Sequence, residues 1–307
     1  MKTMKIKNRH EISDKMKVHL RVRQVGGHEV RIITLRPDLQ VSISNNHFHG
    51  TWHIIGNERT ARLLSRLLWG LSFQKTENTL ILIDGSQLTP NPFDASPSLP
   101  FIIALGDTFT LRARELKQIR QWSSRGRLGP PDRTIRWHTF SLDDHFNTLR
   151  YQWDRSQETV NEAQYFSRYT AEDEQLRAPP TLQEVEGALF FRGNRMTLRE
   201  AAFTCCYMRQ IAPHDLYAGS YEYLTYHLKS HGYDHYGEVQ FVADYHQLLS
   251  AAKVAKRELG LSGNTEMERL EIGDYAKRVV LKRDRQRYAE RARGSIADVA
   301  HDGLGDE

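Results

Sequence analysis

Two short apolar runs constrain the fold of this chain more than any other feature of its sequence. They are the segments TLILIDG, which begins at Thr79, and FIIALGD, which begins at Phe101. Short apolar runs without alternation are typical of strands that are covered on both faces. The sequence therefore predicts an α/β fold with a central sheet in which these two strands are buried.

The chain before these runs alternates between apolar and polar residues with a period of two. In KVHLRVRQV, at residues 17–25, this period places Val18 and Leu20 on one face. Gly26 and Gly27 then suit a tight hairpin, because glycine tolerates the positive φ that such a turn requires. EVRIITL is the expected return strand and LQVSI the expected third strand. We therefore expect the sheet to begin with a three-stranded antiparallel meander.

Helical patterns and a third apolar strand complete the first half of the chain. Asn57 is a plausible N-cap for a helix to about Phe73, because the leucines that follow it fall on one helical face. A second helix is expected in TLRARELKQIRQWSS, and TIRWHTF is expected to be another central strand. The fold class predicted for residues 1–153 is thus α/β with a mixed sheet.

The second half of the chain has a different composition, since all 13 tyrosines lie at Tyr151 or later. Residues 154–180 are acidic and end in RAPPT, which predicts a linker. From Thr181 onward, segments such as TLQEVEGALFF and TLREAAFTCCYMRQI have helical spacing, and we expect no strand after residue 150. The prediction is an all-helical C-terminal domain at 181–293, followed by a disordered tail at 294–307.

Composition excludes several classes of protein. The chain has no apolar run of the roughly 18 residues needed to span a membrane, and its basic start is followed by no apolar signal segment. The only cysteines are the adjacent Cys205 and Cys206, so we expect no disulfide framework and a reducing cytoplasm. No glycine-rich phosphate loop or G-x-S-x-G motif is present, which argues against the common NTPases, dinucleotide oxidoreductases and serine hydrolases.

The positive charge is concentrated in blocks. Residues 2–23, 112–136 and 277–293 each contain eight Lys or Arg and two acidic residues, within a net charge of +5. Such blocks suit contact with phosphate backbones, so DNA or RNA is the expected partner, although solvated helix faces are an equal alternative. The candidate nucleic-acid-binding residues are Arg59, Arg62, Arg66, Arg112, Arg120, Arg125, Arg127, Lys282 and Arg283.

Three histidines occur within seven residues, at His47, His49 and His53. If the strand from Leu39 continued through them, its period of two would place all three on one face, as candidate metal ligands. The segment HFH resembles the His-hydrophobic-His motif of the HUH nucleases. That resemblance implies a divalent metal on the histidines and a tyrosine nucleophile, for which YHLK, with Tyr226 and Lys229, fits the Tyr-x-x-Lys pattern. The alternative is an ordinary strand end.

Asp84 and Asp107 each follow one of the two apolar runs. Ligands in open sheets bind beyond the carboxyl ends of parallel strands, where two carboxylates can hold Mg²⁺ against a phosphate. LIDGSQL also resembles the opening strand of the PIN and NYN-like nucleases, which implies that Asp84 is a metal ligand. The alternative is that both aspartates serve as turn or cap residues.

Three functions are compatible with these patterns. The first is a basic protein that contacts a nucleic-acid backbone. The second is a metal-dependent phosphodiesterase or nuclease that uses Mg²⁺, Mn²⁺ or Zn²⁺ at the histidines or the aspartates. The third is a non-catalytic subunit whose helical part binds a protein partner. The sequence favours them in that order.

Overall fold

The structure is a computed structural model. It describes residues 12–156, 165, 181–211, 220–224, 237–280 and 282. The chain divides into two compact units. The first comprises Met1–Pro90 with Pro97–Ala243, and the second comprises Asn91–Ser96 with Asp244–Glu307. All strands among the described residues belong to the first unit.

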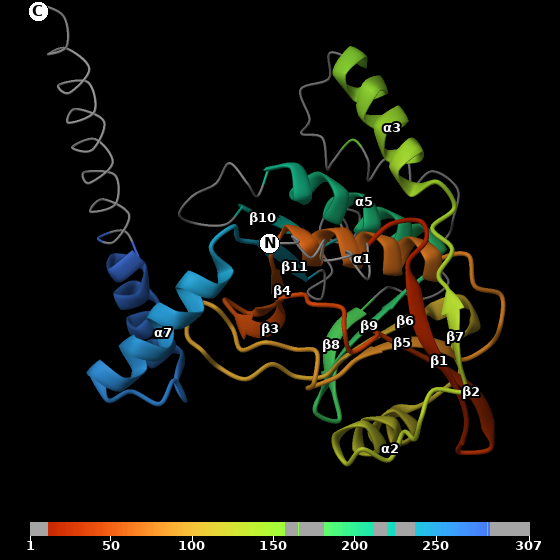
Figure 1. The fold of residues 1–307 in the computed structure, drawn as a ribbon, viewed down its shortest axis with the longest axis horizontal. Helices are drawn as coiled ribbons and strands as arrows, with labels where there is room; N and C mark the ends of the chain where they lie inside the picture. The colour runs from red at the N-terminus through yellow and green to blue at the C-terminus, as the bar shows by residue number, and fades with distance from the viewer. Residues whose placement is uncertain are drawn as a thin grey trace, which may run out of the picture. The chain divides into compact units, whose positions relative to one another are not determined.

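A mixed sheet of seven strands forms the centre of the first unit. Its strands are β1 Lys17–Val25, β2 His28–Thr34, β5 Thr79–Ile83, β6 Phe101–Leu105, β7 Arg133–Arg136, β8 Thr181–Val185 and β9 Ala188–Gly193. They lie in the order β7-β1-β2-β5-β6-β9-β8 (Figure 1). β2 is parallel to β5 and β6 is parallel to β9, whereas the other neighbours are antiparallel. The expected mixed α/β sheet is confirmed.

Helices cover both faces of this sheet. α1 (Glu58–Leu71) and α5 (Arg195–Ile211) lie on one face, and α2 (Ala113–Ser124) lies on the other (Figure 1). Along β5, Ile81 joins the core shared with α1, whereas its neighbour Leu80 joins the core shared with α2. The apolar runs are buried on both faces for this reason, as their composition predicted.

α1 begins where the sequence places it. The side chain of Asn57 accepts a hydrogen bond from the backbone N–H of Thr60 at 3.1 Å, which satisfies one of the free donors of the first turn. The leucines of α1 are all buried against the sheet: Leu63, Leu64, Leu67, Leu68 and Leu71. Burial of this stripe fixes the helix to the face that carries Ile81 and Ile83.

A smaller sheet of four strands lies in the same unit. Its strands are β3 Ile43–Phe48, β4 Thr51–Gly56, β10 Ser220–Tyr223 and β11 Glu238–Phe241, in the order β10-β11-β4-β3. The expected three-stranded meander is therefore wrong in its third strand, because β3 pairs with β4 and not with β2. The segment between them contains Pro37, which offers no backbone donor to a ladder.

The segment that begins at Thr181 is not helical. β8 and β9 form an antiparallel hairpin, and β9 pairs with β6. Leu182, Leu189 and Phe191 are buried in the core shared with α1, and this burial overrides the helical spacing of the segment. The expectation that no strand follows residue 150, with an all-helical region from residue 181, is wrong.

Two other expectations need correction. β7 was expected to be a central strand, but it lies at an edge of the seven-stranded sheet and pairs with β1. Three of its four residues are exposed. The helix α3 runs from Leu142 to Ser156, so the expected linker at 154–180 begins inside a helix. Most of that linker and the whole tail at 294–307 lie outside the described residues.

The second unit contains helices. α7 spans Tyr245–Leu259 and ends at Gly260, whose φ of 66° is left-handed, and residues 266–280 form another helix. The ammonium of Lys256 lies 3.5 Å from the carbonyl oxygen of Ala95. The ammonium of Lys277 lies 6.0 Å from the ring centre of Phe93. These contacts join both helices to the 91–96 segment. None of the helices in the described ranges has the length and apolarity needed to cross a bilayer.

Candidate nucleic-acid interface

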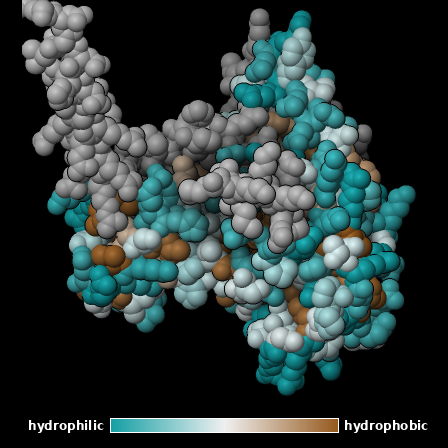
Figure 2. All heavy atoms as spheres, in the orientation of Figure 1, coloured by the Kyte–Doolittle hydropathy of each residue, from teal (hydrophilic) through white to brown (hydrophobic). Residues whose placement is uncertain are grey.

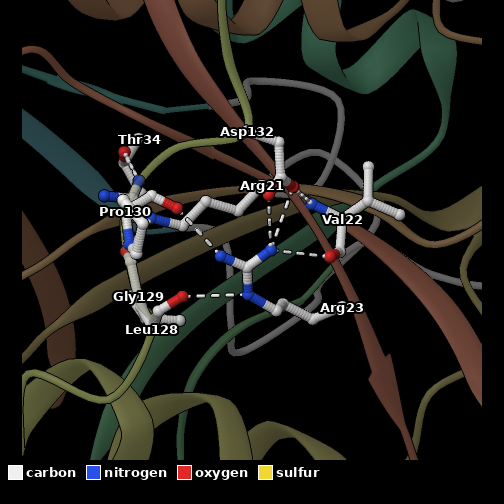
Figure 3. Close-up of polar contacts among 8 residues, drawn as sticks. All are labelled: Arg21, Val22, Arg23, Thr34, Leu128, Gly129, Pro130 and Asp132. Carbon is white, nitrogen blue, oxygen red and sulfur yellow. Dashed lines mark hydrogen bonds and ion pairs between the residues drawn. The ribbon is translucent and has the colours of Figure 1, made fainter.

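The loop between α2 and β7, residues 125–132, is held against the strand β1 by Arg23. The guanidinium donates to the carbonyl oxygens of Leu128 and Pro130, each at 2.9 Å (Figure 3). It also donates to Asp132 at the other end of the loop. Arginine suits this position because its planar fork carries five N–H donors in fixed directions. One side chain thus fixes three points of the loop.

Arg21 supports the same loop from two residues earlier in β1. Its Nε donates to the carbonyl oxygen of Gly129 at 2.9 Å, and its Nη1 donates to the hydroxyl of Thr34 at 2.6 Å (Figure 3). Arg21 and Arg23 share a face because side chains alternate along a strand. Burial lowers the pKa of Arg21, and the neighbouring charge of Arg23 lowers it further. Both arginines serve to shape the loop.

The two acidic residues of the basic segment 112–136 are both engaged within the fold. Glu115 accepts a hydrogen bond from the backbone N–H of Arg112 at 3.0 Å and so caps the start of α2. Asp132 accepts from the backbone N–H of Val22 at 2.6 Å and from Arg23. The Val22 amide and the Arg23 guanidinium lower the pKa of Asp132. Neither carboxylate is directed at the other cations of the segment.

Several cations of this segment remain exposed. Arg125, Arg127 and Arg133 are exposed, and no ion pair joins any of them to another described residue. Arg112 is also exposed, whereas Arg120 is half-buried with its Nε unpartnered. The surface around α2 is hydrophilic (Figure 2). The loop thus carries two exposed cations, Arg125 and Arg127, which we call the loop cations. Arg133 is directly opposite Leu20 in the β7–β1 ladder, so its side chain lies on the face of the sheet that carries α1.

The arginines of α1 do not extend this surface, because α1 and α2 lie on opposite faces of the sheet. Arg59 is exposed, and Arg62 pairs with Glu58 at 3.0 Å one turn earlier. Arg66 is only 4% exposed and pairs with Asp143 of α3. Arg59, Arg62 and Arg66, selected from the sequence as nucleic-acid-binding candidates, therefore do not form one exposed basic stripe. Of the tail candidates, Lys282 is helical and exposed in the second unit, and Arg283 lies outside the described residues.

Asp84 and Asp107 do not meet at one edge of the sheet. β5 and β6 are antiparallel, so the residues that follow them lie at opposite ends of the sheet. Asp84 accepts hydrogen bonds from the Ser86 hydroxyl at 2.6 Å and the Ser123 hydroxyl at 2.8 Å. Asp107 lies 3.7 Å from the Nε of Arg195. The expected pair of carboxylates is wrong, because its premise was that both strands run in the same direction.

The three histidines do not share a face. β3 ends at Phe48 and β4 begins at Thr51, with His49 and Gly50 in the turn at φ values of 50° and 78°. His53 is opposite Asn46 in the ladder, so His47, one residue further along β3, points to the other face. The expectation of a continuous strand is wrong because the chain reverses at His49–Gly50.

Among the described residues, no group of three or more His, Cys, Asp or Glu side chains is placed to hold a metal ion. Tyr226 and Lys229, the nucleophile and its partner in the HUH-like pattern, lie outside the described residues. Burial lowers the pKa of His53 below its usual 6.5, and a hydrogen bond with the Phe48 carbonyl offsets part of that effect. His53 also lies 3.4 Å from Glu238 of β11.

No protein-family model matches the chain, and no curated protein or solved structure is significantly similar to it.

The two residues that hold the loop, Arg21 and Arg23, were not selected from the sequence. Arg21 and Arg23 alternate on one strand face, which indicates a shared environment but not its partner. Their contact with residues 128–132 depends on pairing between segments far apart in the sequence.

Proposed function

We propose that this protein binds the phosphate backbone of a nucleic acid through the loop cations Arg125 and Arg127. The contact is electrostatic and positions the ligand without reading its sequence. Arg112, on the flank of α2, adds a further exposed charge of the same segment.

One observation carries the proposal. Both carboxylates of the segment are engaged in the fold, Glu115 with a backbone amide and Asp132 with Arg23, while the loop cations have no ion pair among the described residues. On a solvated surface of mixed charge, acidic residues would instead lie beside the arginines and pair with them, as Glu58 pairs with Arg62 on α1. The loop thus presents positive charge that no residue of the described ranges neutralises through an ion pair.

The arrangement of the loop also supports binding. Arg23 and Arg21 donate hydrogen bonds to three carbonyl oxygens of the loop, so the loop does not need to become ordered when a ligand binds. A preorganised surface loses less conformational entropy on association than a flexible chain does. The arginine side chains on it suit phosphate, because a guanidinium donates two parallel hydrogen bonds to one anion.

The experiment is a salt titration of binding to fluorescently labelled DNA and RNA of about 20 nucleotides, from roughly 50 to 200 mM salt. The wild type is compared with Arg125→Gln/Arg127→Gln. The matched control is Arg59→Gln/Arg62→Gln, which removes the same charge from exposed positions of α1.

We expect the loop variant to weaken binding and to reduce the slope of log K against log salt by about two. The α1 variant should bind almost as the wild type does. Equal losses in both variants would show that only net charge matters. No binding by the wild type at low salt would remove the proposal altogether.

A further inference from the structure

Trp122, in the last turn of α2, is half-buried, and part of its indole ring faces solvent. The buried part packs against the core that α2 shares with the sheet. Among the described residues, no aromatic ring or cation is stacked on the indole, and no acceptor pairs with its N–H. Tryptophan carries a large ring and one donor, which both find partners when the fold encloses them. The exposed part of Trp122 therefore offers a ring surface that the described fold does not use.

Tryptophans elsewhere in the chain show the contrast. Trp69 is 4% exposed, and its ring centre lies 5.1 Å from that of Phe203. Trp137 is 2% exposed and donates its indole N–H to the carbonyl oxygen of Arg66 at 2.9 Å. Both of these rings serve the core. Trp122 lies instead at the border between the core and the surface.

The end of α2 places Trp122 beside the loop cations. The backbone N–H of Arg127 donates to the carbonyl oxygen of Trp122 at 2.6 Å, and the N–H of Gly126 donates to that of Ser123 at 3.0 Å. These two bonds, with Gly126 at a φ of 65°, form a Schellman motif that ends the helix at Arg125. The motif brings the residue after the glycine, Arg127, next to Trp122. Arg125 follows Trp122 by three residues and so lies on the same side of the helix end.

A partly exposed ring beside two exposed cations suits a single-stranded nucleic acid. Proteins that bind single strands combine positive charge along the backbone with aromatic rings on which the bases stack. In a duplex, each base is covered on both faces by its neighbours, so a base can stack on a protein ring only after it has been unstacked at a cost in free energy. An unpaired strand offers its bases without that cost.

We propose that the protein binds single-stranded nucleic acid at this end of α2, with one base stacked on the indole of Trp122 and the adjoining phosphates on Arg125 and Arg127. The inference rests on the proposed function and adds to it the kind of strand that is bound. Any base can occupy the position, because every base has a π-face. Binding should therefore tolerate changes of sequence.

The test compares the affinity for one labelled oligonucleotide, at low salt, as a single strand and as its duplex. The wild type is compared with Trp122→Leu, which keeps an apolar side chain against the core but cannot stack, and with Trp122→Phe, which keeps a smaller ring. The matched control is Trp52→Leu, at a half-buried tryptophan of β4 whose ring centre lies 5.3 Å from that of His47. Quenching of tryptophan fluorescence by the unlabelled strand is recorded for each protein, and thermal unfolding shows that each variant is folded.

We expect Trp122→Leu to lose roughly 5- to 100-fold in affinity for the single strand. Its affinity for the duplex should change little, because the phosphate contacts of Arg125 and Arg127 remain. Trp122→Phe should retain most of the affinity for the single strand but lose most of the quenching seen in the wild type. This variant keeps the test decisive if Trp122→Leu fails to fold. Trp52→Leu should bind both forms as the wild type does.

Several outcomes would overturn the inference. Equal losses for the single strand and the duplex in Trp122→Leu would mean that the ring only supports the loop. The same loss in Trp52→Leu would assign the effect to general destabilisation. If Trp122→Leu binds the single strand as the wild type does, stacking is rejected while phosphate binding by the loop cations stands. If the wild type binds neither form at low salt, the inference and the proposed function are both wrong.

Discussion

Arg23 and Asp132 form a forked contact, in which one guanidinium nitrogen lies 3.0 Å and 2.9 Å from the two carboxylate oxygens. This contact closes the loop that carries Arg125 and Arg127. The other two guanidinium nitrogens of Arg23 donate to the carbonyl oxygens of Leu128 and Pro130. A single ammonium cannot reach all three loop residues, so we expect Arg23→Lys to loosen the loop although the charge is kept.

The measurement is amide hydrogen exchange in residues 125–132. We expect exchange to be roughly tenfold faster in Arg23→Lys than in the wild type, because local opening becomes easier. Arg36→Lys is the control, since Arg36 pairs with Asp38 outside this loop at 3.1 Å. Unchanged exchange in Arg23→Lys would mean that the loop is held by other contacts.

Two arginines one turn apart in α1 are expected to differ sharply in their effect on stability. Arg66 is 4% exposed and pairs with Asp143, so Arg66→Ala removes both packing and the partner of a carboxylate. We expect a loss of about 2–3 kcal/mol in the free energy of unfolding, measured with urea. Arg62→Ala should cost about 0.3–0.5 kcal/mol, because its pair with Glu58 is solvent-exposed. Similar losses would place Arg66 at the surface.

Stability should fall as the pH drops through the titration range of histidine. Burial holds the pKa of His53 in the folded protein below its usual value of 6.5, so the unfolded chain takes up a proton first. The stability that His53 contributes is therefore fully present above pH 6.5 and is lost progressively below it. Urea unfolding at about pH 7.5 and about pH 5.5, in metal-free buffer, measures the difference. We expect a weaker pH dependence in His53→Gln, and an identical dependence would assign the effect to other groups.

Gly70 lies inside α1, where replacement of glycine by alanine would ordinarily raise the free energy of unfolding by about 1 kcal/mol. Here a Cβ would lie 2.3 Å from Nε1 of Trp137, which donates a hydrogen bond to the Arg66 carbonyl. We therefore expect Gly70→Ala to lower the free energy of unfolding by about 1–3 kcal/mol. Gly85→Ala, at a position with open space around it, should be close to neutral. Stabilisation by Gly70→Ala would contradict this packing.

The elements that could be predicted are those whose helical or strand conformation is determined by residues of the same segment. The leucine stripe of α1 and the apolar runs of β5 and β6 have compositions that only a covered sheet can bury. The cap at Asn57 is local as well, since its partner is three residues away. The cap depends on a contact that is close in sequence, and the burial of the apolar segments does not depend on which element covers them.

The errors arose where a turn or a distant partner decides the structure. His49–Gly50 and Glu186–Gly187 both have positive φ at two successive residues, as a tight hairpin turn of type I′ requires. Glycine preceded by His or Glu is a weaker signal for this turn than Asn-Gly or Asp-Gly. Because these turns were not recognised, we expected one continuous strand in place of β3 and β4 and a helix in place of β8 and β9.

Whether the candidate site residues lie close together depends on distant pairing as well. Whether Asp84 and Asp107 meet depends on the relative direction of β5 and β6, which no residue of either strand encodes. The basic segment 112–136 needed only its composition to be selected. One of its two acids, Asp132, could be recognised as engaged only when Val22 and Arg23 were placed beside it.

The position of β9 beside β6 has a consequence for how the chain is made. On the ribosome, β6 emerges with one partner, β5, and its other edge stays open until residues 188–193 have been synthesised. An open, apolar strand edge is a template for aggregation. A truncated chain that stops at residue 180 leaves this edge permanently uncovered, so it should precipitate on expression, whereas a chain that extends past the β8–β9 hairpin closes it.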